Sequence, residues 1–116
     1  FKDLLKKAGL LALGTDFPVE QVNPFLTFYA AVTRQDLEAY PEGGFTPSQL
    51  LSREEALKGM TTWAAYSNFE EEEKGSIEVG KFADFVLLDK DIMQIPGSEI
   101  PELQAVKVSV NGEWVK

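Results

Sequence analysis

The sequence of 116 residues contains no cysteine and no histidine. Without cysteine, a disulfide-stapled domain, a thiolate metal site and a cysteine nucleophile are excluded. Without histidine, the Ser-His-Asp triad, histidine-based zinc sites and the most common general base are excluded. The chain by itself is therefore poorly equipped to be a complete enzyme of most familiar kinds.

Positive charge and long apolar runs are also scarce. Lys and Arg total 11 against 19 Asp and Glu, a formal net charge of −8, which disfavours nucleic acid and anionic membrane surfaces as partners. No stretch approaches the roughly 20 apolar residues that cross a bilayer, and the N-terminal sequence lacks the order of a secretory signal. The hydrophobic content of 44% is that of a globular protein. We therefore expect a globular, cytoplasmic protein.

Residues 1–69 show an α/β pattern. The first residue is Phe, and an amphipathic helical stripe runs from Phe1 to Ala8, so we expect the chain to be part of a longer polypeptide. The unalternating run Leu10–Leu13 predicts a strand buried on both faces. Asn23 followed by Pro24 predicts a helix to about Thr33, and a capping box of Ser52 and Glu55 predicts a second helix.

The pattern changes near residue 70, which we take as a domain boundary between residues 1–69 and 70–116. Beyond it the chain favours antiparallel β-structure, with strands predicted at Ser76–Val79 and Phe85–Leu88. Alternating valines from Val106 to Val110 predict a further strand. The dipeptide Asn111-Gly112 then predicts a tight hairpin.

Two segments resemble ligand-binding motifs, but the residues around them favour a structural role. Gly75–Lys81 matches most of a phosphate-binding loop, but Phe82 replaces the magnesium-binding hydroxyl and a strand follows instead of a helix, so turn glycines are favoured. Glu70–Glu73 could attract calcium. Four consecutive carboxylates do not converge on one ion, however, so a solvated charged linker is favoured.

Asp16 is the main candidate for chemistry. It follows the predicted buried strand, and α/β barrels present their reacting groups at the C-terminal ends of strands. The alternative is an Asx-turn or a cap for the following loop. From position alone, the loop-capping interpretation is favoured.

A wider set of motifs resembles the C-terminal segment of the metal-dependent amidohydrolases, closest to the subgroup called amidohydrolase family 3. Leu13–Glu20 is similar to the segment around the eighth barrel strand, and Ser52–Leu57 to the last helix of the family. Gly75–Asp89 is similar to the return into a β-sandwich domain, and Val110–Val115 to the final hairpin. The resemblance covers nearly the whole chain in the order of the family.

This resemblance implies the last strand and helices of a (β/α)8 TIM-like barrel, followed by antiparallel strands of a small β-sandwich. It implies an enzyme that hydrolyses non-peptide carbon–nitrogen bonds of small amide-type substrates with metal-activated water. The family aspartate maps to Asp16, which the resemblance makes a metal ligand and proton acceptor. The metal, expected to be zinc, also requires histidines that this sequence lacks. We therefore expect the chain alone to bind no metal tightly and to be inactive.

The alternative is a non-catalytic folding or interaction module in which β-hairpins mediate association and Asp16 caps a loop. One barrel strand cannot close a barrel, and a partial sandwich has open edges. As an isolated piece the chain is therefore predicted to form a small α+β unit and to associate with itself.

Overall fold

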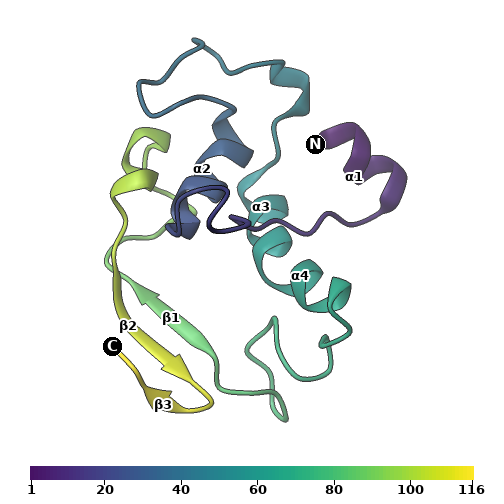
Figure 1. Cartoon of the computed structure of the whole chain (residues 1–116), viewed down its shortest axis with the longest axis vertical. Helices are drawn as coiled ribbons and strands as arrows, with labels where there is room; N and C mark the ends of the chain where they lie inside the picture. Colours follow the sequence, from purple (N-terminus) through teal and green to yellow (C-terminus); the bar gives the residue numbers. More distant parts are fainter.

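A computed structural model describes all residues, 1–116, as a group of short helices with a small sheet at one end (Figure 1). No helix is long and apolar enough to cross a membrane. The elements in chain order are α1 (Lys2–Ala8), α2 (Pro24–Thr33), η1 (Pro47–Gln49), α3 (Arg53–Met60), α4 (Thr62–Ser67), β1 (Phe85–Leu88), η2 (Gly97–Glu102), β2 (Ala105–Val110) and β3 (Glu113–Trp114), where η marks a 3-10 helix.

The capping residues confirm two of the predicted helices. Asn23 Oδ1 accepts the Phe25 N–H at 3.0 Å at the start of α2. At the start of α3, Ser52 Oγ accepts the Glu55 N–H at 3.1 Å, and the Glu55 carboxylate accepts the Ser52 N–H at 2.8 Å. Each of these contacts satisfies a backbone group that the first helical turn leaves free. The helix predicted from Ser52 is interrupted at Thr61, so that α3 and α4 are separate.

The core lies around α2, which contributes its two large buried side chains, Phe28 and Tyr29. They pack in one cluster with Ala56 of α3 and with Ile100 and Leu103, which lie in and just after η2. Burial of these side chains removes apolar surface from water and drives the helices together. Residues from both sides of the predicted boundary at residue 70 therefore share this core, while the domain division itself stays a prediction.

The predicted strand at Leu10–Leu13 is wrong. These residues are extended but belong to no sheet, and none of them is fully buried. Their only backbone hydrogen bond to another segment runs from the Leu13 N–H to the carbonyl of Gly59 in α3, at 2.9 Å. A β-strand needs a neighbouring strand, and all three strands of the structure come from residues 85–114 and pair with one another.

The second half of the chain contains less β-structure than predicted. Ser76–Val79 forms turns rather than a strand, and Gly75 and Gly80 on either side have φ of 93° and 98°. Positive φ is a conformation that glycine adopts without steric cost, so these residues act as turn glycines. Residues 97–102 form the 3-10 helix η2.

The antiparallel sheet itself is confirmed, with strand order β1-β2-β3. Asn111 and Gly112 have φ of 50° and 82°, as a type I′ hairpin between β2 and β3 requires. Val86 lies opposite Val108 in the register, so both point to the same side of the sheet as Val106 and Val110. We call these four residues the valine face. On the other side, Phe85 and Trp114 pack edge to face with ring centroids 5.5 Å apart.

Asp84 joins the start of this sheet to its hairpin. Its Oδ1 accepts the Asn111 N–H at 2.6 Å, so this side chain satisfies a backbone donor of the hairpin. We expect Asp84→Ala to lower the free energy of unfolding by about 1–2 kcal/mol, because a charge-assisted hydrogen bond is lost. Urea denaturation measures this effect. Asp84→Asn retains an oxygen acceptor and should lose less; equal stability of Asp84→Ala and the parent chain would contradict the prediction.

Candidate functional site

Asp16 lies exposed at the end of the extended segment 10–15, at the start of a tight turn. Its φ of 51° is in the left-handed region, which Asp tolerates better than most residues. The turn is closed by backbone atoms, since the Asp16 carbonyl accepts the Val19 N–H at 2.8 Å. The preceding Thr15 Oγ1 accepts the Phe17 N–H at 3.4 Å.

The Asp16 carboxylate is not used to hold this turn. An Asx-turn would need the N–H of the residue two positions on, and that residue is Pro18, which has no N–H. The Val19 N–H is already bonded to the Asp16 backbone carbonyl. Asp16 takes part in none of the ion pairs. The carboxylate therefore faces solvent with its oxygens free to bind a ligand.

The chain does not itself assemble a metal site. No group of three or more Asp, Glu, His or Cys side chains is placed to hold an ion. A divalent metal would thus find one carboxylate at Asp16, whereas zinc is bound by three or four protein ligands. The residues present do not fit a complete metal centre.

The acidic run Glu70–Glu73 and the glycine segment Gly75–Lys81 make contacts within the fold. Glu70 pairs with Lys74 at 3.1 Å, and hydrogen bonds from Asn68 first and Lys74 second lower the pKa of the Glu70 carboxyl. In the glycine segment, Lys81 Nζ donates to Ser76 Oγ at 2.8 Å. The chain continues from there into β1, so no helix N-terminus is available to bind phosphate.

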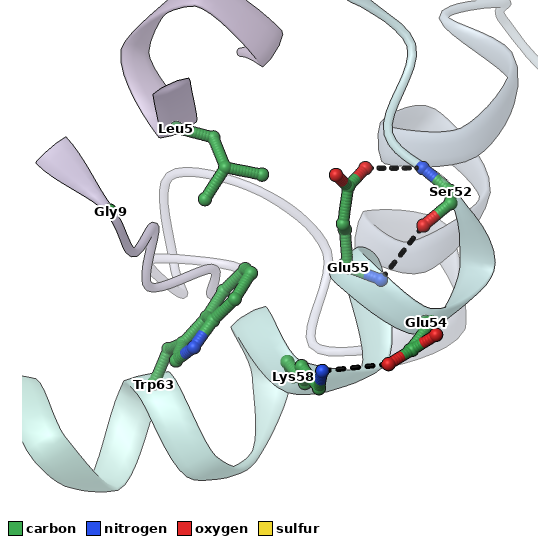
Figure 2. A pocket seen from close by; sticks show the side chains of 7 residues that line it. All are labelled: Leu5, Gly9, Ser52, Glu54, Glu55, Lys58 and Trp63. Carbon is green, nitrogen blue, oxygen red and sulfur yellow. Dashed lines mark hydrogen bonds and ion pairs between the residues drawn. The ribbon is translucent and has the colours of Figure 1, made fainter. Parts of the chain in front are cut away.

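A hollow of about 400 Å³ lies between the end of α1 and the helices α3 and α4 (Figure 2). Its polar groups already bind one another: Ser52 and Glu55 form the capping box, and Lys58 pairs with Glu54 at 2.7 Å. Lys2 also pairs with Glu55, and this contact, followed by the Ser52 N–H, lowers the pKa of the Glu55 carboxyl. This hollow therefore joins helices, and Asp16 is not among the residues that line it.

A second hollow, of about 540 Å³, lies beside the segment that carries Asp16. Leu13 and Gly14, which precede Asp16, line one part of it together with Glu20 and Gln21, which follow. Side chains of α2 line another part. The turn of Asp16 therefore borders a partly apolar hollow, although Asp16 is not among the residues that line it.

Gly59, the residue of α3 that contacts the Asp16 segment, is marked only weakly by the sequence. Its carbonyl accepts the hydrogen bond from Leu13, three residues before Asp16. The only available signal was a glycine inside a helical pattern, where glycine is unfavourable by about 1 kcal/mol relative to alanine unless packing requires it.

The chain is a small α/β piece in which the exposed carboxylate of Asp16 lies at the end of an extended segment that belongs to no sheet. The Amidohydrolase family matches the chain over residues 1–116. The chain therefore belongs to the Amidohydrolase family, a family of TIM-barrel proteins that are generally metal-dependent.

Three proteins of known sequence are similar to this chain. It is 32% identical over 115 residues to YtcJ of Bacillus subtilis strain 168, which carries the name of an amidohydrolase; the match covers 99% of this chain and 22% of YtcJ. It is 39% identical over 88 residues to LONG AFTER FAR-RED 3 of Arabidopsis thaliana, covering 76% of this chain and 15% of that protein. It is 29% identical over 111 residues to the N-substituted formamide deformylase of Arthrobacter pascens, covering 96% of this chain and 20% of the enzyme.

The chain thus spans between 15% and 22% of the length of these relatives. No solved structure matches it significantly.

Proposed function

We propose that this chain is the C-terminal part of a longer metal-dependent amidohydrolase that hydrolyses non-peptide carbon–nitrogen bonds in small molecules. Within it, Asp16 is a metal ligand and a proton acceptor. The observation that carries this proposal is the free carboxylate of Asp16, which the local turn does not use, in a chain that matches the Amidohydrolase family throughout.

The chemistry of a carboxylate suits both roles. Its oxygens bind divalent metals, and a positioned carboxylate can accept a proton during hydrolysis. The remaining ligands of the metal, which we predict to be zinc, must come from outside this chain, because it has no histidine and no group of three or more acidic side chains placed to hold an ion. The name of the Arthrobacter relative, an N-substituted formamide deformylase, supports an amide-type substrate.

The proposal is tested by comparing the isolated chain with a longer protein that contains it. We expect the chain, after washing with a chelator and adding back zinc, to retain less than stoichiometric zinc and to show no hydrolysis of N-substituted amides. The longer protein should bind zinc stoichiometrically. Elemental analysis and an amine-release assay measure both quantities. Tight zinc binding or turnover by the isolated chain would contradict this division of the site.

A second candidate function, self-association, rests on the valine face. Val86, Val106 and Val110 are each about half exposed on one side of the sheet, and β1 has an edge without a partner strand. Burial of such a face against a second copy would remove apolar surface from water. We therefore propose that the isolated chain associates through this face, as an interaction module.

Light scattering tests this association. The isolated chain is expected to give a mass above the 12.9 kDa of one copy, and the double variant Val106→Lys, Val110→Lys is expected to return it to that mass. A parent chain that is monomeric at all accessible concentrations would contradict the proposal. A cytoplasmic location, and the lack of nucleic-acid and membrane partners, stay predictions.

A further inference from the structure

The segment that carries Asp16 is attached to the rest of the fold at one backbone position. Among residues 10–15, only Leu13 makes a backbone hydrogen bond to another segment, donating its N–H to the Gly59 carbonyl at 2.9 Å. Asp16 adds a bond only to Val19 within its own turn. This bond, together with the packing of the Leu11 and Leu13 side chains against the core, therefore sets where the segment that carries Asp16 lies relative to the helices.

Gly59 has no room for a side chain at this contact. A Cβ atom at residue 59 would lie 2.8 Å from both Cγ and Cδ1 of Leu13 and 2.9 Å from the backbone carbonyl oxygen of Leu11. Non-bonded carbon atoms prefer separations of about 3.5–4.0 Å, so one side of the contact would have to move. Gly59 lies within α3 and is buried, so close approach, and not backbone conformation, is what requires glycine here.

The extended segment is the side that yields. Gly59 is held by the helix and by the core residue Ala56, one turn earlier. Residues 10–15, by contrast, belong to no sheet and are partly exposed. A side chain at residue 59 would thus push Leu11 and Leu13 away from α3 and carry Asp16 with them.

We propose that Gly59 is a positioning residue for Asp16: its missing side chain lets the Leu13 segment seat on α3 and sets where the Asp16 carboxylate lies. This inference rests on the proposed function of Asp16 as a metal ligand and proton acceptor. It adds a residue with no contact to substrate or metal, which acts through the packing of one helix against one segment.

The test is Gly59→Ala in the longer, zinc-loaded protein. A displacement of about 1 Å can cost about 100-fold in rate, so we expect kcat to fall by that order while KM stays within about threefold, since substrate binding is not altered. Zinc affinity, measured by chelator competition, is expected to weaken in parallel. Gly97→Ala is the matched control, because a Cβ there would meet only Thr33 Cγ2, at an ordinary 3.5 Å, and should change neither quantity.

Leu13→Ala supplies the rescue. It removes both Leu13 atoms that the new Cβ would meet and leaves the Leu11 carbonyl oxygen, at 2.9 Å, as the one close contact. The double variant Gly59→Ala, Leu13→Ala should therefore fold and have a kcat within about tenfold of that of Leu13→Ala alone. If Gly59→Ala alone does not fold, the comparison of the double variant with Leu13→Ala tests the inference instead. A double variant that stays unfolded, or whose kcat remains about 100-fold below that of Leu13→Ala, would overturn the inference.

Asp16→Asn separates this inference from the proposed function on which it rests. If Asp16→Asn retains activity and zinc, the proposed role of Asp16 fails. If Asp16→Asn is inactive but Gly59→Ala matches Gly97→Ala in kcat and zinc affinity, the role of Asp16 stands and the positioning role of Gly59 is overturned.

Discussion

Replacing Asp16 by Asn in the longer protein is expected to lower kcat by about 10²–10⁴-fold, the usual loss when a positioned acid–base group is removed. The amide keeps the size of the side chain but cannot accept a proton at neutral pH. Because Asp16 is exposed and takes part in no ion pair, the melting temperature without metal should stay unchanged. Steady-state kinetics and thermal unfolding measure the two effects separately.

Glu42→Gln is a suitable control for this variant. Glu42 is also exposed on a loop and takes part in no ion pair, and the substitution removes the same unit of charge. It should leave kcat within experimental error. If Asp16→Asn behaves like Glu42→Gln, the catalytic role is contradicted, and the Asp16 turn is then only a connection between the segment 10–15 and α2.

Phe28→Ala is expected to lower the free energy of unfolding by about 3–5 kcal/mol, the cost of deleting a buried aromatic ring and leaving a cavity. Phe28 is 1% exposed at the centre of the core, where α2 meets α3 and η2. Small domains are stable by about 5–15 kcal/mol in total. This one substitution therefore removes a large share of the stability, and urea denaturation measures it.

Phe69→Ala is the matched control, since Phe69 is 92% exposed and its loss should change stability by less than about 0.5 kcal/mol. If Phe28→Ala leaves the chain too unstable for an equilibrium transition, the milder Ile100→Val should cost about 0.5–1.5 kcal/mol at a site that is equally buried. Equal effects of Phe28→Ala and Phe69→Ala would contradict the placement of the core around α2.

The features that sequence analysis predicted correctly depend on residues close together in the chain. The N-cap of α2 and the capping box of α3 each involve atoms at most three residues apart. The hairpin depends on the conformations of Asn111 and Gly112 alone. Neighbouring residues select such structures whatever the rest of the chain does, so the sequence is enough to predict them.

The wrong predictions concern strands. Leu10–Leu13 and Ser76–Val79 have the composition of strands, but no strand of this chain lies beside either of them. Apolar composition shows that a segment can be buried in a sheet. Whether the segment forms a strand depends on a neighbouring strand elsewhere in the chain that can pair with it. Phe85–Leu88 has the same composition and does form β1, because β2 is available to pair with it.

The sequence alone determined the chemical inventory of this protein: an aspartate, Asp16, just after an apolar segment, no thiol, no imidazole, and a set of motifs in the order of the Amidohydrolase family. These are properties of residue types and their spacing, which folding does not change. Only the tertiary structure decided that the Asp16 carboxylate is free of its own turn and that Gly59 seats the segment that carries it. The role of Gly59 depends on contacts with residues more than 40 positions away in the chain. The free carboxylate of Asp16 depends on which backbone donors are already bonded after folding. Local sequence patterns contain neither kind of information.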